Sequence, residues 1–530
     1  MKINVMATDA QTYDYVVIGS GPAGCVMAKT LSDDNNASVL LLEAGGNDDA
    51  NPLIQAANSN LYAHFPEFFW FGQSIPQAAV DGRDFALTGG RTRGGGSSVN
   101  GEMYVRPSPY VLRQWEKVGG AQWSPENVTR EFVELERYNG RVGRPDIHGT
   151  AGLLDIRQNY PDPPGFINKI TAAFEKATGL AAVEDYNDPM TPLGPFKRWQ
   201  LYQKKDGNRA SASIAFLSED VVDSDGMGVD GRRLTVQDRA TAVRIVFDAD
   251  KRAVGVRYIL DGGTTDATAT KKVIVCAGLR SAELLMHSGI GPKDVLEKAG
   301  VPLVYDSPNI GFHLADDACI SATISMNASD YAEMVRSDPN ARVHAGAFLP
   351  APDGSGERNE RCIQVIVTAA SPEAIHLSIL CVNPKSTGTL KIQSSDPLKI
   401  MLGDFGFLRE DRDMNILMRT LRKYIAPMAK ALGNIDPAYR LVHPSAEELA
   451  DDNRLKAYIR TSFLHTYHDQ SALRMGSKAD GVVNGWGEVY GVKDLIVADA
   501  SIIPYHMDGN TSACAYLTGY TIAKHLKDER

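Results

Sequence analysis

The residues with the clearest chemical potential stand near the N-terminus, in the pattern Gly19-x-Gly21-x-x-Gly24 followed by Glu43. The first glycine permits a tight turn, the second lets a pyrophosphate approach the backbone, and the third lets a helix pack against a strand. An acid at the position of Glu43 accepts a hydrogen bond from a ribose hydroxyl and disfavours a 2′-phosphate. The pattern therefore predicts binding of FAD or NAD rather than NADP; a purely structural glycine turn is the alternative.

A second glycine-rich stretch spans residues 89–106. Three consecutive glycines, Gly94-Gly95-Gly96, allow the backbone to pass directly over a flat ligand, and Ser97, Ser98 and Asn100 supply neutral hydrogen-bonding groups. The stretch is typical of a ligand-binding loop, although a flexible surface loop is an alternative interpretation.

The elements that must position the first pattern form a βαβ unit. Residues 15–18 are a short apolar run with the character of a buried strand. The following helix presents Ala23, Met27 and Leu31 on one face, and a second buried strand covers residues 39–42. The glycines therefore lie between a strand and a helix, where the helix N-terminus attracts a phosphate.

Further strands are expected in two parts of the chain, residues 234–276 and 362–392. Four runs read as strands, at residues 234–236, 243–247, 254–258 and 273–276. Residues 362–367 and 390–392 indicate an antiparallel sheet, because they lack the spacing of βαβ units.

Composition limits the class of protein. The 530 residues carry a formal charge of −10, which argues against nucleic acid or an acidic membrane surface as a partner, and 43% of them are hydrophobic, enough for a large core. Six widely spaced cysteines show no zinc-like spacing and favour a reduced, cytoplasmic setting. No apolar run approaches the ~20 residues that span a bilayer. We expect two intertwined domains.

Three stretches resemble the glucose-methanol-choline (GMC) oxidoreductases, a family of FAD flavoproteins: residues 89–106, 277–291 and 497–504. The resemblance implies an α/β fold, in which a Rossmann-like, glutathione-reductase-like FAD-binding domain carries an inserted α+β substrate domain built on an antiparallel sheet. The expected FAD-binding segments are 12–155, 210–312 and 463–530, and the expected substrate-binding segments are 156–209 and 313–462.

The same resemblance implies the cofactor site. Some relatives bond FAD covalently through a histidine, and Val99 occupies that position here, so we expect non-covalent FAD. The expected cofactor-binding residues are Gly19, Gly21, Pro22, Ala23, Gly24, Glu43, Ala44, Arg91, Gly95, Ser98, Asn100, Ala242, Ala277, Asp499, Ala500 and Thr511.

Alcohol oxidation by a flavin needs a base for the hydroxyl proton while hydride leaves for flavin N5, and neutral histidine suits this task. Residues 463–476 resemble the family's catalytic-histidine segment, with His468 at the base. The family's second catalytic position matches Asn510, which can hydrogen-bond the substrate oxygen, and Tyr467 is the expected substrate contact. His468 could instead be a core histidine or a metal ligand, and Asn510 a turn residue.

His465 could share a face with His468, but a metal site needs further ligands that the sequence does not identify, so no metal is expected. Residues 311–317 resemble a family loop with changes at His313 and Asp317, and we assign this loop no catalytic role.

These observations predict an FAD-dependent enzyme that oxidises a primary or secondary alcohol to an aldehyde or ketone, with O2 or another electron acceptor. The alternatives are a hydroxynitrile-lyase-like enzyme with redox-silent FAD, and a non-catalytic or light-responsive flavin-binding protein.

Overall fold

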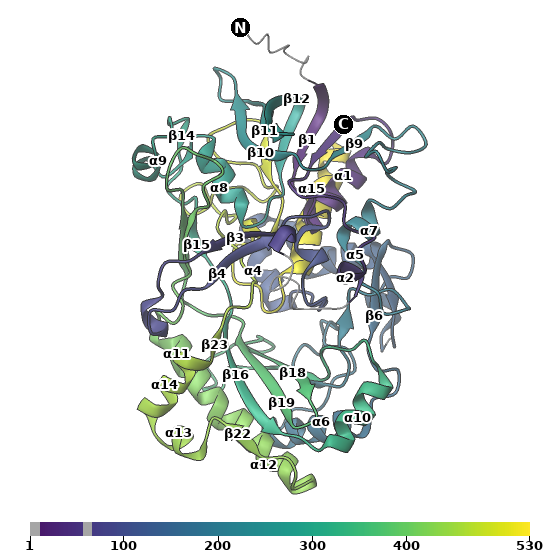
Figure 1. Cartoon of the computed structure of the whole chain (residues 1–530), viewed down its shortest axis with the longest axis vertical. Coiled ribbons are helices and arrows are strands. Elements are labelled where there is room, and N and C mark those ends of the chain that lie inside the picture. The colour runs from purple at the N-terminus through teal and green to yellow at the C-terminus, as the bar shows by residue number, and fades with distance from the viewer. Residues whose placement is uncertain (1–10, 57–65, 142, 530) are drawn as a thin grey trace.

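Two large sheets organise the chain. The computed structural model describes residues 11–56, 66–141 and 143–529. One large sheet lies in the upper half of the view in Figure 1, and the other lies in the lower half. The parallel and antiparallel character of these two sheets confirms the expected α/β fold with a sheet-based second region.

The first sheet has a parallel centre with an antiparallel arm. Its order is β10-β11-β12-β1-β2-β9, with β24 also paired to β12. β24, β12, β1, β2 and β9 run parallel, whereas β10, β11 and β12 pair antiparallel. The strands are β1 (Gln11–Ile18), β2 (Val39–Leu42), β9 (Leu234–Gln237), β10 (Thr241–Phe247), β11 (Ala253–Leu260), β12 (Gly263–Val275) and β24 (Leu495–Val497).

The second sheet is antiparallel, with the order β22-β16-β19-β18-β17-β7 and with β23 paired to β16. Its strands are β7 (Gly194–Phe196), β16 (Ala318–Ser325), β17 (Gly346–Leu349), β18 (Ile363–Ser371), β19 (Ala374–Cys381), β22 (Leu441–His443) and β23 (Phe463–Leu464).

Four small sheets connect these regions. Their strands are β3 (Phe69–Gln73) with β4 (Ala86–Gly90); β5 (Glu136–Asn139), β6 (Leu154–Gln158) and β8 (Gln200–Leu201); β13 (Ile290–Gly291) with β14 (Tyr305–Asp306); and β15 (Phe312–Leu314), β20 (Gly388–Lys391) and β21 (Leu402–Asp404).

Helices cover the sheets. They are α1 (Pro22–Ser32), α2 (Pro52–Gln55), α4 (Pro109–Gly119), α5 (Pro125–Leu135), α6 (Gly165–Thr178), α7 (Ala212–Phe216), α8 (Arg280–His287), α9 (Lys293–Ala299), α10 (Ala328–Ser337), α11 (Asp411–Thr420), α12 (Ala426–Ile435), α13 (Ala446–Ala450), α14 (Asp452–Ser462) and α15 (Ser512–Asp528). In the part of the chain that the structure describes, every helix is too short or too polar to cross a membrane.

The expected division of the chain into FAD-binding and substrate-binding segments remains a prediction. The strands of the two large sheets can be compared with these segments. The strands of the first sheet all lie in the segments expected to bind FAD. Those of the second lie in the segments expected to bind substrate, except β23, which joins β16 across the expected boundary at residue 463.

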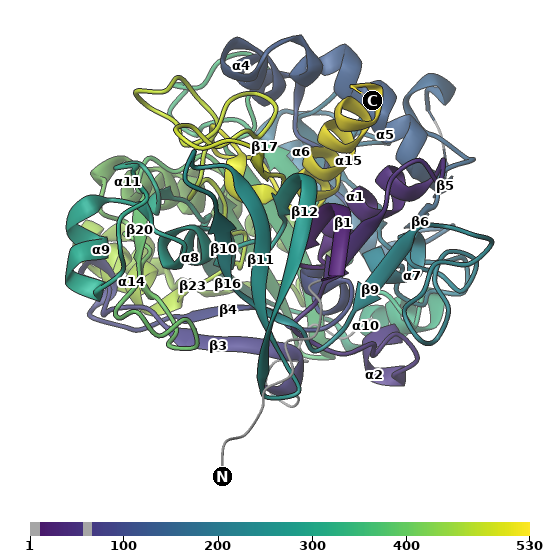
Figure 2. The same cartoon turned by 90° about the horizontal axis from the view of Figure 1, so that it is seen from above.

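The C-terminal helix α15 returns to the start of the chain and lies beside α1 (Figure 2). The two helices approach closely, because a Cβ at Gly519 would lie 2.5 Å from the Ala23 carbonyl oxygen. This packing brings the residues before α15 to the carboxyl ends of the parallel strands, the edge at which open α/β sheets bind ligands.

Helix α8 buries a histidine. His287 is 3% exposed, and burial lowers its pKa to about 4, assisted by the positive charges of Arg280 and Arg244. The folded protein therefore holds this imidazole neutral, whereas the unfolded chain binds a proton below pH ~6.5.

Acidification from pH 7 to pH 5 should destabilise the fold through His287 by about 1–2 kcal/mol, because only the unfolded state takes up the proton. We expect the His287→Gln variant to lose less stability over this interval than the wild type, measured as the thermal unfolding midpoint at both pH values. His376→Gln, at an exposed site on β19, is the matched control. An equal loss in wild type and H287Q would contradict this account.

Candidate active site

The loop that carries His468 follows β23 and is held against β16 and the residues just before β16. β23 pairs with β16, and beyond it the backbones of Ala315 and Gln470 exchange two hydrogen bonds of 3.0 Å. Five residues separate β23 from Gln470, so the intervening loop must turn sharply and is anchored at both ends.

Asp316 closes this turn. Its Oδ1 accepts a 2.9 Å hydrogen bond from the His468 backbone N–H, and its Oδ2 accepts one of 3.2 Å from the Thr466 N–H. The Thr466 hydroxyl also donates to Oδ1. Tyr467, inside the turn, has φ of 61°, a left-handed conformation uncommon for a side chain of its size. The carboxylate thus holds backbone donors that would otherwise lack partners.

Asp317 binds the imidazole itself. Its Oδ2 lies 2.7 Å from His468 Nδ1, and the carboxylate is fully buried. The imidazole is 13% exposed, so one edge remains accessible while the other is held by a charge-assisted hydrogen bond.

Asn510 faces the opposite ring nitrogen. Its Nδ2 lies 2.9 Å from His468 Nε2, and its Oδ1 accepts a 2.9 Å hydrogen bond from Gln364 Nε2 on β18. Because Gln364 donates to the oxygen, the amide nitrogen of Asn510 must point at the histidine. Nε2 is then the acceptor, and Nδ1 carries the proton that it donates to Asp317. The network presents an unprotonated Nε2 beside an amide donor.

The charge around His468 adjusts its proton affinity. Burial alone would lower the pKa of His468, but the hydrogen bond and charge of Asp317, with the charges of Asp316 and Asp469, raise it above its ordinary value. The carboxylates therefore stabilise the imidazolium that forms when Nε2 accepts a proton.

Replacing Asp317 with asparagine should slow proton transfer to His468, because the amide removes the charge that stabilises the imidazolium and no longer fixes the Nδ1–H tautomer. We expect the rate of substrate-dependent flavin reduction to fall by about 10- to 10⁴-fold, the latter being the upper range of a general-base contribution. Asp306→Asn, at an exposed acid, is the control. A D317N rate within twofold of wild type, at unchanged flavin content, would remove Asp317 from this role.

The glycine pattern has the shape of a phosphate site. A Cβ at Gly24 would lie 1.8 Å from the Gly19 carbonyl oxygen, so the third glycine is required for α1 to pack against β1. A Cβ at Gly21 would meet nothing within 4 Å. Gly21 is the N-cap residue of α1, so no side chain caps the N–H groups of the first turn. Open space therefore adjoins the first turn of α1, which contains Pro22 and Ala23 and offers N–H groups to an anion.

Glu43 ends β2 beside this turn. Its Oε2 accepts hydrogen bonds from the Ser20 N–H at 3.0 Å and the Ser20 hydroxyl at 2.6 Å, and Oε1 accepts from the Gly45 N–H at 2.7 Å across Ala44. Burial raises the pKa of Glu43, while these bonds oppose the rise. Ala242 lies in β10, two residues after Ala240, whose N–H donates to the Glu43 carbonyl. The predicted ribose and adenine residues thus lie in one region.

The second glycine stretch forms a tight turn against the first. Gly95 has φ of 52°, and a Cβ there would lie 2.8 Å from Gly21 Cα. Ser98 donates its hydroxyl to the Arg93 carbonyl at 2.7 Å. The turn is therefore an ordered loop placed directly beside the predicted phosphate site.

Asn100 joins this loop to other elements. Its Oδ1 accepts from Arg209 Nη1 at 2.9 Å, and its Nδ2 lies 3.5 Å from the Ser512 hydroxyl, next to Thr511 at the start of α15. Arg91 instead turns its guanidinium over the Trp70 ring, at 4.8 Å from the centroid.

Asp499 connects the remaining predicted segments. Its Oδ2 accepts from the Gly278 N–H, which follows Ala277, at 2.8 Å and from the Ser281 hydroxyl at 2.6 Å, while Oδ1 accepts from Ser501. Ala500, the next residue, accepts from the Ser471 N–H of the His468 loop. These contacts make Asp499 a connector between the nucleotide region and the His468 loop.

Gly21, at the N-cap of α1, and Gly24, inside α1, permit a matched test of the predicted cofactor site. In Gly21→Ala the methyl group enters open space, so we expect unchanged stability of the flavin-free protein but FAD affinity at least ~10-fold weaker, a loss of ~1.4 kcal/mol. Gly24→Ala should lower both, because its methyl group collides with backbone. The flavin-to-protein absorbance ratio and the unfolding midpoint of stripped protein measure the two effects. Full flavin retention by G21A would contradict the predicted phosphate approach.

Three residues that contact His468 or Asn510 were not predicted from the sequence: Asp316, Asp317 and Gln364. Asp316 and Asp317 lie in the loop 311–317, to which we assigned no catalytic role. The aspartate at position 317, where the family loop has histidine, was the one feature of the sequence that could have indicated their role. Gln364 carried no signal, because it lies inside an ordinary strand pattern. Tyr467, the predicted substrate residue, is 41% exposed and packs on His465, with ring centroids 4.3 Å apart.

Sequence profiles of the GMC oxidoreductases match residues 13–319 and 384–519. The chain belongs to the GMC oxidoreductase family. An uncharacterised GMC-type oxidoreductase of Mycobacterium bovis is 31% identical over 97% of this chain and 99% of its own.

Other relatives extend the comparison. The alcohol dehydrogenase [acceptor] of Pseudomonas putida is 29% identical, covering 94% of this chain and 93% of its own length. Pyridoxine 4-oxidase from Mesorbium loti has a TM-score of 0.85 and 24% identity, covering 98% of this chain and 99% of the other, which establishes a shared fold. The Rossmann-like FAD-binding region and the sheet-based second region are thus those of a GMC oxidoreductase.

Proposed function

We propose that this GMC oxidoreductase oxidises a primary or secondary alcohol to an aldehyde or ketone, using non-covalently bound FAD, with His468 as the base. The observation that carries the proposal is the 2.9 Å contact between His468 Nε2 and Asn510 Nδ2, in which a proton acceptor and a hydrogen-bond donor face one another. The alcohol dehydrogenase from Pseudomonas putida, similar over nearly the whole chain, supports an alcohol as the substrate class.

The predicted residues fit FAD. The open space at Gly21 and the uncapped first turn of α1 suit a pyrophosphate, while Glu43 keeps acceptor capacity for a ribose hydroxyl. Val99, at the position where some relatives carry the covalent histidine, has no nucleophilic atom. These features support non-covalent binding by the sixteen residues named from the sequence.

The chain's own groups then handle the substrate hydroxyl. FAD, when bound, supplies the acceptor for the hydrogen and two electrons that leave the alcohol carbon. The hydroxyl gives its proton to His468 Nε2 and accepts a hydrogen bond from Asn510 Nδ2, so its oxygen is held while the carbonyl forms. Asp317 stabilises the resulting imidazolium, and Gln364 keeps the Asn510 amide in the required orientation. Dioxygen or another acceptor then completes the cycle.

Anaerobic mixing with a panel of aromatic, furanic, sugar and aliphatic alcohols tests this proposal. We expect at least one alcohol to bleach the flavin absorbance, and His468→Ala to slow that bleaching by about 10²- to 10⁴-fold, because it removes the base. His376→Ala, at an exposed histidine, should match the wild type.

Two results would overturn the proposal. A flavin that stays oxidised with every alcohol, together with an unaltered H468A protein, would favour a non-catalytic flavoprotein. Release of cyanide from a cyanohydrin without flavin reduction would favour a lyase. Peroxide formation compared with dye reduction would then identify the electron acceptor of an active enzyme.

A further inference from the structure

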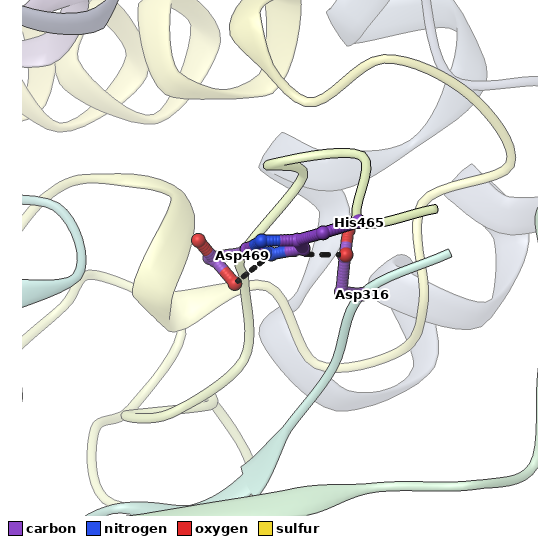
Figure 3. Close-up of side chains that lie close together, drawn as sticks. All are labelled: Asp316, His465 and Asp469. Carbon is purple, nitrogen blue, oxygen red and sulfur yellow. Dashed lines mark ion pairs between the residues drawn. The ribbon is translucent and has the colours of Figure 1, made fainter. Parts of the chain in front are cut away.

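A cluster of three side chains lies on the loop that carries His468. Asp316, His465 and Asp469 converge there, and the imidazole of His465 lies between the two carboxylates (Figure 3). His465 Nε2 is 3.2 Å from Asp316 Oδ2 and 3.6 Å from Asp469 Oδ1. The cluster adjoins His468, whose backbone N–H donates to Asp316 Oδ1, whereas the His468 imidazole itself contacts Asp317 and Asn510.

The cluster is buried and rich in negative charge. The side chains of Asp316, His465 and Asp469 are 0%, 3% and 9% exposed. Aromatic rings of Phe405 and Tyr467 lie against the imidazole, at 4.5 and 4.3 Å between centroids. Two ionised carboxylates in such an environment need compensating positive charge. A protonated His465 would leave one negative charge, whereas a divalent cation with neutral His465 balances both.

The contacts also differ from ordinary hydrogen bonds. At 3.2 and 3.6 Å both are long, and within the described residues neither His465 Nε2 nor Asp469 Oδ1 makes a hydrogen bond of ordinary geometry. Asp316 Oδ2 receives the Thr466 N–H at 3.2 Å and retains a second lone pair. Three donor atoms therefore have lone pairs available at the same place.

Their separations suit a small cation. Nε2 is 3.2 and 3.6 Å from the two oxygens, and the three donor atoms lie within 4.8 Å of one another. One central point can therefore lie within about 2.4 Å of each atom, close to the ~2.0–2.2 Å of zinc bonds to nitrogen and oxygen. One imidazole with two carboxylates is a zinc-type donor set, whereas magnesium prefers six oxygens in octahedral geometry. A water molecule would complete four-coordination.

We propose that Asp316, His465 and Asp469 bind one zinc ion. The ion ties the two ends of the His468 loop to Asp316, two residues before β16, and so fixes the loop that presents the proposed base. This site does not depend on the alcohol-oxidation proposal, because the loop geometry alone defines it.

Zinc binding is measured on the flavin-loaded protein, first stripped with EDTA and then dialysed against Zn2+. We expect about one zinc per chain by elemental analysis, and an affinity at least ~10-fold lower in His465→Gln and Asp469→Asn by calorimetry. Both replacements remove a ligand while preserving side-chain size approximately. His376→Gln and Asp306→Asn, both exposed, should bind as the wild type does.

X-ray absorption at the zinc edge gives the ligands directly. We expect nitrogen and oxygen ligands at about 2.0–2.1 Å, without the ~2.3 Å distance of a thiolate. Failure of the wild type to retain zinc, equal binding by H465Q and D469N, or a sulfur ligand from one of the buried cysteines would each overturn the proposal. The flavin absorbance at constant protein concentration shows whether a variant is folded. If both variants lose flavin, the zinc-edge spectrum of the wild type decides whether the proposed ligands bind the ion.

Discussion

The buried hydrogen bond between Asp317 and His468 is the interaction on which the proposed active site depends. A fully buried carboxylate that accepts a hydrogen bond from Nδ1–H leaves Nε2 as the acceptor nitrogen of the ring, and its charge compensates the proton that Nε2 would take up. The family loop that residues 311–317 resemble ends in Asp-His, whereas this chain has Asp316-Asp317. Asp316 therefore binds the backbone of the His468 loop, and Asp317, in place of the histidine, binds the imidazole.

A second constraint comes from close backbone packing. α1 can lie against β1 only because Gly24 has no side chain, and the turn of Gly95 can lie against Gly21 for the same reason. These approaches bring the first turn of α1, the second glycine loop and the start of α15 into one region, where Asn100 connects the last two. The predicted nucleotide site is thus built from backbone proximity more than from side-chain chemistry.

Both large sheets contribute to the proposed catalytic centre. Asn510 precedes α15, which packs on α1, whereas Gln364 and the strand beside Asp317 belong to the antiparallel sheet. The orientation of one amide therefore depends on the docking of two regions of the chain. Any relative movement of these regions would change the donor that faces His468.

The sequence alone determined the features that follow from local chemistry. The βαβ unit was predictable because buried strands and glycine turns have short-range signatures, and strands 39–42 and 241–247 agree closely with the predicted runs 39–42 and 243–247. The family could be identified because its motifs are contiguous, and the same motifs predicted His468 and Asn510 as the catalytic residues. The contacts of Asp317 and Gln364 could not be predicted, since their partners lie 151 and 146 residues away in the chain. Only strand pairing and the packing of the two sheets decide which distant side chains meet, because a local pattern specifies which face a residue occupies and not what lies opposite.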